Sequence, residues 1–272
     1  MTKKYALVTG GAGGLGSVTT RLLVTKGWHV FAADFDELAL NRLNNEASIT
    51  PIKLDVTSAE SVAEAKEIVL KQVDQLDAVV NFAGILALGS MVEMEEAQLQ
   101  RVLDVNVMGT FRTNKTFYPL VKKAKGRIIN ISSETGWQSG APFNGAYAMS
   151  KHAIECYSDS LRREMSFFDI PVIKVQPGPF KTDMVGSIES NFKKAVDGST
   201  DFKNILNRTK RMAEKESEKS HDPKILAEVI FKALTVSKPK VAYSVKPDPM
   251  RSLLEFFPTT WADALFKKVM SN

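Results

Sequence analysis

The chain has 272 residues, of which 44% are apolar and 25% charged, and a formal net charge of +5. These values are typical of one large α/β domain, and the basic residues are spread along the chain instead of forming the stripe that a nucleic-acid interface needs. No apolar run is long enough to span a bilayer, the three His residues lack metal-ligand spacing, and the single cysteine, Cys156, excludes an intramolecular disulfide.

The first predicted elements indicate a cofactor-binding unit. A strand at Tyr5–Thr9 begins almost at the first residue with no signal peptide before it, which, with the lone cysteine, predicts a soluble, reducing, cytoplasmic setting. A glycine-rich turn at residues 9–16 follows, and then a helix predicted from Ser17 to Lys26. Glycines permit a tight turn, and the free N–H groups at the start of the helix suit a pyrophosphate.

A carboxylate ends the next predicted strand. Residues 28–33 lead to Asp34, about twenty residues after the glycine turn, as in the dinucleotide-binding fingerprint. Such a carboxylate accepts hydrogen bonds from the adenosine ribose and repels a 2′-phosphate, and Phe35, not a basic residue, follows it. The pattern therefore predicts NAD in preference to NADP. The simpler alternative makes Asp34 the N-cap of a helix over Glu37–Asn44.

Strands and helices continue to alternate up to about residue 182. Further strands are predicted at Ile52–Leu54, Asp77–Asn81, Arg127–Ser132 and Val172–Gln176, and helices at Ser58–Val73, Glu95–Lys123 and Gly145–Phe168. This alternation predicts an α/β fold with a doubly wound parallel sheet, a Rossmann fold, whose ligands lie beyond the carboxyl ends of the strands. Six residues with suitable chemistry fall at those ends: Gly10, Asp34, Asp55, Asn81, Ser133 and Pro177.

Tyr147 and Lys151 form the candidate acid–base pair. Their spacing of four places the phenol and the ammonium on one helix face. A phenol titrates near pH ~10, and a neighbouring ammonium is expected to lower that pKa towards the working pH. Ser133, at the end of a buried strand, could hydrogen-bond a substrate oxygen beside the phenol. A surface Tyr–Lys pair is the alternative, because the spacing alone also occurs by chance.

The C-terminal third predicts a cover for this site. Residues 184–220 are polar and helical in character, as in an insertion over a substrate, and a helix (Pro223–Leu234) and a last strand (Val241–Val245) follow. In the tail, about 249–272, Thr260 is the predicted N-cap of a helix. The apolar stripe of that helix is expected to pack on the enzyme's own body, with a substrate cover, a neighbouring subunit or a membrane surface as alternatives; it comprises Trp261, Leu265, Phe266, Val269 and Met270.

Together these motifs resemble the short-chain dehydrogenase/reductase family. The resemblance extends to about Thr182 and rests on Thr9-Gly10-x-x-x-Gly14-x-Gly16, Asp34, Asp55-Val56, Asn81-x-Ala83-Gly84, Asn106, Ser133, Tyr147-x-x-x-Lys151 and Pro177-Gly178-x-x-x-Thr182. Phe82 departs from the family, which has a second Asn there. Residues 146–165 are similar to the branch of retinol, hydroxysteroid and D-3-hydroxybutyrate dehydrogenases.

The resemblance implies four catalytic residues. Tyr147 would be the general acid/base, Lys151 would hold the nicotinamide ribose and lower the pKa of Tyr147, and Ser133 would orient the substrate oxygen. Asn106 would bend its helix and hold a water of the proton relay; a merely kinked helix interior is its alternative interpretation.

The resemblance also implies the cofactor contacts. They are Gly10, Gly14 and Gly16 at the pyrophosphate, Asp34 at the ribose, Asp55 and Val56 at the adenine, Asn81 and Gly84 on the adenosine side, Phe180 and Thr182 at the carboxamide, and further contacts at Leu15, Phe35, Ala83, Pro177 and Gly178.

The sequence thus predicts a single domain over residues 1–272 and an NAD-dependent oxidoreductase of a secondary alcohol or ketone, with an apolar steroid-, retinoid- or fatty-like substrate. The alternatives are a dehydrogenase of a small hydroxy acid or sugar alcohol and a non-catalytic dinucleotide-binding scaffold. A homodimer or homotetramer is expected, paired through the helices Glu95–Lys123 and Gly145–Phe168; no metal and no nucleic-acid partner are expected.

Overall fold

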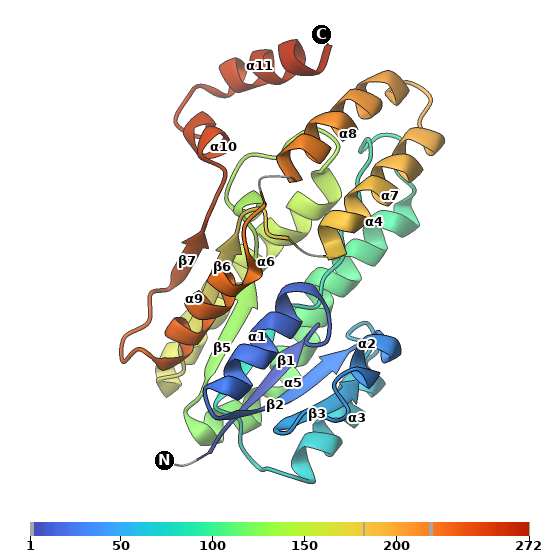
Figure 1. Cartoon of the computed structure of the whole chain (residues 1–272). Helices are drawn as coiled ribbons and strands as arrows, with labels where there is room; N and C mark the ends of the chain where they lie inside the picture. Colours follow the sequence, from blue (N-terminus) through green and yellow to red (C-terminus); the bar gives the residue numbers. More distant parts are fainter. Residues whose placement is uncertain (1–2, 182, 218–219, 272) are drawn as a thin grey trace.

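One parallel sheet with the strand order β3-β2-β1-β4-β5-β6-β7 runs through the molecule (Figure 1). The computed structural model describes residues 3–181, 183–217 and 220–271, and only the backbone of 183–187, 215–217 and 271. Within these residues the strands are β1 (Lys4–Thr9), β2 (Trp28–Asp34), β3 (Ile49–Lys53), β4 (Ala78–Asn81), β5 (Arg127–Ile131), β6 (Val172–Pro177) and β7 (Ala242–Val245). Every neighbouring pair is parallel, so the predicted doubly wound sheet is confirmed.

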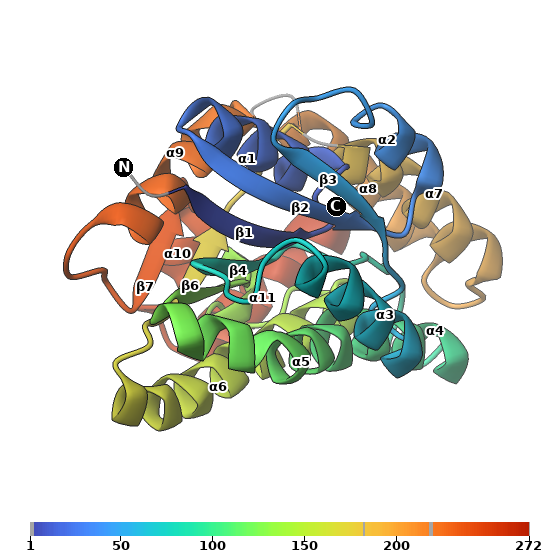
Figure 2. The ribbon, with the colours of Figure 1, turned by 90° about the horizontal axis from the view of Figure 1, so that it is seen from below.

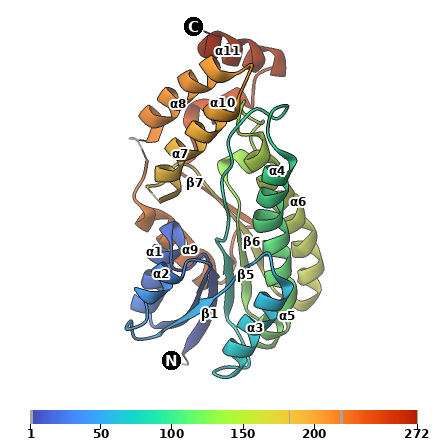
Figure 3. The ribbon, with the colours of Figure 1, turned by 90° about the vertical axis from the view of Figure 1, so that its right-hand side faces the viewer.

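Helices cover both faces of this sheet (Figures 2 and 3). The helices are α1 (Gly14–Thr25), α2 (Glu37–Asn41), α3 (Ala59–Leu70), α4 (Glu96–Leu103), α5 (Gly109–Ala124), α6 (Gly145–Met165), α7 (Asp183–Gly198), α8 (Lys203–Ser217), α9 (Pro223–Thr235), α10 (Pro249–Leu254) and α11 (Thr259–Ser271). Short turns of other helix types lie at Asp104–Met108 (π), Glu134–Gly136 and Ser166–Phe168 (both 3₁₀). Helices α1, α2 and α9 cover one face, and α3, α5 and α6 cover the other.

Successive side chains of each strand point to opposite faces of the sheet, so the strands contribute to two hydrophobic cores, one on each face. In β1, Leu7 points to the side of α3, α5 and α6, whereas Ala6 and Val8 point to α1 and α9. In β5, Ile128 and Ile129 divide in the same way. Because both faces are covered, these strands are apolar at nearly every position, which is why they are continuous apolar runs in the sequence.

The strand order reverses between β1 and β4. The chain moves outward from β1 to β3, returns to place β4 on the other side of β1, and then moves outward to β7. The loops after β1 and β4 therefore diverge, and a crevice opens between them at the carboxyl edge, where open α/β sheets bind ligands. Helices α7, α8, α10 and α11 lie beyond this edge (Figures 1 and 3).

Several predicted boundaries are wrong. Helix α1 begins at Gly14, inside the glycine turn, and α2 ends at Asn41 and is capped by Asp36, whose side chain accepts from Leu38 N and Ala39 N. Asp34 is therefore not the N-cap of α2. The single long helix predicted over Glu95–Lys123 is two helices joined by the π-helical turn.

The tail differs most from its prediction. Helix α11 begins at Thr259, so Thr260 lies inside it and is not its N-cap. The predicted stripe is divided: Phe266 and Met270 are half-buried, and the helix contacts α8, but Trp261 is 64% exposed. Three-to-four-residue spacing identifies a face of a helix, but the packing direction depends on where α8 lies. Cys156, on α6, is likewise exposed. No helix in residues 3–181, 183–217 and 220–271 is long and apolar enough to cross a membrane.

Candidate active site

The glycine turn after β1 forms a backbone cradle that side chains would fill. Gly10 has φ +65°, and a Cβ there would lie 3.0 Å from Ala83 N. A Cβ at Gly16 would lie 2.0 Å from Gly10 O, so only glycine fits where α1 meets the turn. Gly14 opens α1, and no acidic side chain occupies its first turn. Leu15 is half-buried beside the α1–α9 core. Exposed N–H groups at a helix N-terminus without a competing carboxylate fit the pyrophosphate of a dinucleotide.

Asp34 supports this turn from the end of β2. Its Oδ2 accepts from Ala12 N (3.1 Å) and its Oδ1 from Asp36 N (3.1 Å). A basic residue also lies close by, contrary to what the sequence suggests: Lys53 pairs with Asp34 across β2 and β3. Its ammonium donates to Phe35 O, lies 4.4 Å from the Phe35 ring centroid and pairs with Glu37 at 3.2 Å. Strand register, not sequence proximity, produces this neighbour.

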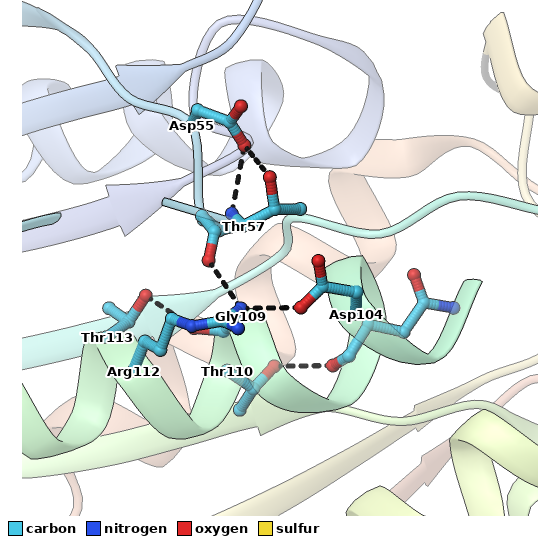
Figure 4. A network of polar contacts seen from close by, with 9 residues as sticks. Asp55, Thr57, Asp104, Gly109, Thr110, Arg112 and Thr113 are labelled. Carbon is cyan, nitrogen blue, oxygen red and sulfur yellow. Dashed lines mark hydrogen bonds and ion pairs between the residues drawn. The ribbon is translucent and has the colours of Figure 1, made fainter. Parts of the chain in front are cut away.

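Asp55 and Val56 follow β3, and Figure 4 shows Asp55 hydrogen-bonded to Thr57. Burial raises the pKa of the Asp55 carboxyl, but hydrogen bonds from Thr57 N (2.9 Å) and Thr57 Oγ1 (2.7 Å) outweigh it, so the pKa is lowered overall. Arg112, on α5, donates hydrogen bonds to Val56 O (3.3 Å) and to Asp104 Oδ1 (2.7 Å). The segment is thereby fixed against the start of α5.

The side chain of Asn81 belongs to a buried amide network. Its Nδ2 donates to Asn114 Oδ1 (2.8 Å) and to Asn130 Oδ1 (3.0 Å), and Asn130 donates to Ser158 Oγ (2.9 Å). Its amide nitrogen is therefore committed to joining β4, α5, β5 and α6. The following residues turn back to β1, where Ala83 N donates to Thr9 Oγ1 (3.3 Å).

Asn106 lies in the π-helical turn between α4 and α5. Its Oδ1 accepts from Ile85 N (2.7 Å), and its Nδ2 donates to Ile85 O (3.0 Å) and Ser150 Oγ (2.9 Å). A Cβ at Gly84 would lie 3.3 Å from Asn106 Oδ1. The kinked helix interior is thus present, and the side chain links the loop after β4 to α6. The water-holding role stays a prediction.

Ser133, Tyr147 and Lys151 meet at the ends of β5 and α6. Ser133 Oγ accepts from Thr135 N (3.2 Å), and the Ser133 hydroxyl is close enough to the Tyr147 phenol to lower its pKa. Lys151, 6% exposed, donates from Nζ to Ile131 O (2.9 Å) and lies 5.4 Å from the Tyr147 ring centroid. The three side chains predicted from sequence are therefore brought together.

The electrostatics of this group differ from the prediction. Burial raises the pKa of the Tyr147 phenol to about 12, the hydrogen bond with Ser133 opposes it, and the Glu134 carboxylate raises it further. Burial lowers the pKa of the Lys151 ammonium to about 8, although Glu155 opposes the shift. The expected lowering of the Tyr147 pKa is thus wrong for the protein alone, because desolvation is the largest effect on the phenol and Glu134 adds to it.

The segment after β6 also lies at the carboxyl edge of the sheet. A Cβ at Gly178 would lie 2.0 Å from Lys246 O, so the chain passes closely beside the end of β7. Pro177 ends β6, and Phe180 is 3% exposed and bridges to His221. Thr182 lies outside the described residues.

A cavity of about 520 Å³ lies between the segment that joins Ser133 to Tyr147 and helices α8, α10 and α11. Its apolar wall includes Phe143, Phe202, Leu254 and Phe266, and the rings of Phe143 and Phe202 meet edge to face at 5.7 Å. The sequence analysis did not identify Phe143, because no motif surrounds it. The one feature that could have indicated a role is its place in the sequence between Ser133 and Tyr147.

Comparisons with known proteins agree with this geometry. The family described as short chain dehydrogenase matches residues 4–193. Retinol dehydrogenase 16 of Rattus norvegicus is 33% identical over 279 residues, covering 97% of this chain and 87% of the relative. Short-chain dehydrogenase/reductase family 9C member 7 of Mus musculus is 36% identical over 204 residues, covering 72% and 64%. The crystal structure of a short-chain dehydrogenase from Streptomyces avermitilis superposes with a TM-score of 0.80 at 25% identity, covering 100% of this chain and 98% of that one.

Proposed function

The chain belongs to the short-chain dehydrogenase/reductase family, and we propose that it is an NAD(H)-dependent oxidoreductase that interconverts an apolar secondary alcohol and its ketone. The observation that carries the proposal is the grouping of buried Ser133 and Lys151 with the half-buried phenol of Tyr147, beside a glycine cradle that fits a dinucleotide. A scaffold without catalysis would gain nothing from burying the Lys151 ammonium beside a phenol, since a buried charge is costly.

The residues of the chain handle the proton. Ser133 hydrogen-bonds the substrate oxygen, and Tyr147 receives the hydroxyl proton as an alcohol is oxidised, or donates it as a ketone is reduced. Lys151 places a cation beside the phenol ring. This cation favours the phenolate form of Tyr147, which accepts the hydroxyl proton of the alcohol. A bound nicotinamide dinucleotide supplies the acceptor or donor of the hydride from the carbinol carbon. In the oxidation one C–H and one O–H bond are broken and the C=O bond is completed.

The preference for NAD is proposed from Asp34. Its carboxylate stands at the end of β2, next to the glycine turn, where it would accept hydrogen bonds from the ribose hydroxyls and repel a 2′-phosphate. Lys53 favours NADP by its charge, but its ammonium is occupied by Phe35 O and Glu37. The two groups therefore favour opposite cofactors, and the unpaired charge of Asp34 is expected to dominate.

An apolar substrate is supported by the cavity beside the catalytic segment. About 520 Å³ is within the range of ligand pockets, roughly 300–1,000 Å³, and the aromatic part of its lining suits a hydrocarbon skeleton. Arg251, Glu255, Asp263 and Lys267 also line the cavity, and the side chains of Ser133, Tyr147 and Lys151 do not. A small hydroxy acid or sugar alcohol would leave much of the aromatic lining in contact with water.

A dehydrogenase screen tests the function. Steroid, retinoid, fatty and short-chain secondary alcohols are each offered with NAD and with NADP, and the Tyr147→Phe variant is measured in parallel. We expect turnover of bulky apolar alcohols with NAD and a ~10²–10⁴-fold lower rate in the variant, whose dinucleotide affinity stays within a few-fold. Equal turnover in both proteins would refute the assignment of Tyr147, and preference for small polar alcohols would refute the substrate class.

We propose pairing of two copies through α4, α5 and α6. The residues Leu99, Leu103, Val107 and Phe111 repeat every four positions along α4 and α5, and none is buried in the single chain. Phe111 meets Tyr157 of α6 edge to face at 6.2 Å, so both helices contribute to one apolar surface. The cytoplasmic setting is also a proposal, supported by the single cysteine.

A further inference from the structure

Helix α10, the first helix of the tail, is hydrogen-bonded to the segment that follows Ser133. Asp248 N, at the start of α10, donates to Glu134 Oε2 (2.6 Å), and Gln138 Nε2 donates to Ser252 Oγ (3.2 Å). Ser139 N and Oγ donate to the carboxylate of Glu255 (2.8 and 2.9 Å). These contacts join residues more than a hundred positions apart, and together they cover the segment from the residue after Ser133 to the edge of the cavity.

Glu134 is the innermost of these contacts. It follows Ser133 directly and is only 9% exposed, although carboxylates are rarely buried without a specific partner. Its turn packs on α6, because a Cβ at Gly136 would lie 3.1 Å from Lys151 O and 3.2 Å from Glu155 Cγ. The carboxylate is therefore held between the catalytic helix and the start of α10.

We propose that Glu134 is a positioning residue that fastens α10 to the catalytic turn and holds a carboxylate next to Ser133, where its charge acts on the proton step of the reaction. The inference rests on the proposed function, because it assigns Glu134 a role in the proton step of that reaction. The tail that lines the substrate cavity and the acid–base residue are then coupled by one side chain.

The charges around Tyr147 support this role. From α6, Lys151 offers a cation whose effect Glu155 reinforces by keeping it protonated. From the 3₁₀ turn, Ser133 offers a hydroxyl and Glu134 a carboxylate, and the carboxylate raises the pKa of the phenol. From α10, the Asp248 carboxylate is engaged with Arg251 N (2.8 Å). Among the described residues, Glu134 is therefore the anion that has a resolved effect on the phenol.

Glu134→Gln in the full chain separates the two parts of the proposal. The amide oxygen still accepts the Asp248 N–H, so α10 stays docked, but the charge is lost. Alcohol oxidation needs the phenolate, so the acid limb of its kcat profile, measured with 2-octanol and NAD, is expected to move to lower pH by ~0.5 unit or more. A glutamate with only a structural role would leave the limb unmoved, and that result would overturn the electrostatic part.

Glu255→Gln is the matched control, because it removes an equal charge from the contact between α10 and the same loop, at the opposite end of α10 from Asp248. We expect its pH limb to coincide with that of the unmodified protein. Glu134→Ala tests docking without turnover: trypsin should cleave after Lys246 and Arg251 faster than in Glu134→Gln. Equal cleavage of the two variants would overturn the fastening role.

The outcomes also separate this inference from the proposed function. If Tyr147→Phe abolishes oxidation and Glu134→Gln leaves the pH limb in place, the function stands and this inference fails. If no alcohol is oxidised by the unmodified protein, the function fails and the electrostatic role with it, while the proteolysis result alone decides whether Glu134 fastens the tail.

Discussion

Cofactor choice gives the sharpest test of the site, because one carboxylate and one ammonium on neighbouring strands oppose each other. Asp34→Ala removes both the proposed ribose acceptor and the bonds from Ala12 N and Asp36 N that shape the turn. Asp34→Asn is the better perturbation, because its amide oxygen still accepts one hydrogen bond and only the charge is lost. Comparing the two variants separates repulsion of a phosphate from support of the ribose.

The expected magnitudes follow from simple electrostatics. Hydrogen bonds to a charged group contribute about 1.5–3 kcal/mol each, so losing two to the ribose costs Asp34→Ala about 3 kcal/mol, or ~100-fold in kcat/KM with NAD. A doubly charged phosphate about 5 Å from a carboxylate, at an effective dielectric constant of ~60, is repelled by about 2 kcal/mol. Asp34→Asn is therefore expected to raise kcat/KM with NADP about 30-fold.

The assay is initial-rate kinetics with both dinucleotides for the unmodified protein, both Asp34 variants, and Asp34→Asn combined with Lys53→Met. Once Asp34 is neutral, Lys53 is the nearest described cation on the adjoining strand, so the combined variant should lose most of the NADP gain. A higher kcat/KM with NADPH than with NADH in the unmodified protein would refute the preference. An undiminished NADP gain in the combined variant would refute the part assigned to Lys53.

Three further predictions concern pH, the cover and assembly. Because burial raises the pKa of Tyr147 to about 12, phenolate is scarce at neutral pH; oxidation should accelerate steadily from pH 7 to 10 while ketone reduction stays nearly level, and a level oxidation profile would contradict this. Glu93, which accepts from Ser199 Oγ and Asp201 N, has its pKa lowered from 4.5 to about 2, chiefly by its backbone bond from Asp201. Its stabilisation is therefore full above pH 4.5 and is lost as the pH falls towards 2, so the melting temperatures of the unmodified protein and Glu93→Gln should converge over that window; a constant difference would exclude the linkage. Light scattering should show at least a dimer at micromolar concentration, and Phe111→Glu should shift it towards monomer, whereas a monomeric unmodified protein would exclude the proposed interface.

The sequence predicted those parts of the site that depend on local chemistry and on the sheet. Apolar runs and glycine spacing located the strands, and parallel strands bring their carboxyl ends to one edge, so Gly10, Asp34 and Ser133 could be grouped in advance. The neighbour of Asp34 across the sheet could not be predicted, because Lys53 reaches it through a register that no local pattern specifies.

The degree to which side chains are buried was the second property that the sequence did not predict. The four-residue spacing of Tyr147 and Lys151 correctly predicts their proximity, but the pKa of each depends on how much water the surrounding turns exclude. The same is true of Glu134, which in sequence is an unremarkable acidic residue and in the structure is almost enclosed. Helix faces in the tail were mistaken for a related reason, since periodicity identifies a stripe but not its partner.

The two halves of the site are stabilised in different ways, and this difference bears on function. The catalytic half is fixed by buried bonds among regular elements, in which Asn106 and the Asn81 network join β4, α5, β5 and α6. The covering half combines an apolar cluster, in which Phe192, Val196 and Leu206 pack with Leu88, with polar contacts at its ends, chiefly those of Glu93 with the α7–α8 junction and of Glu134 and Glu255 with α10. Segments with few such contacts open at low cost, whereas displacing a reactive group by 1 Å is enough to slow catalysis. We propose that α7, α8 and α10 cover the site and that substrate enters by their movement, while Ser133, Tyr147 and Lys151 keep their geometry.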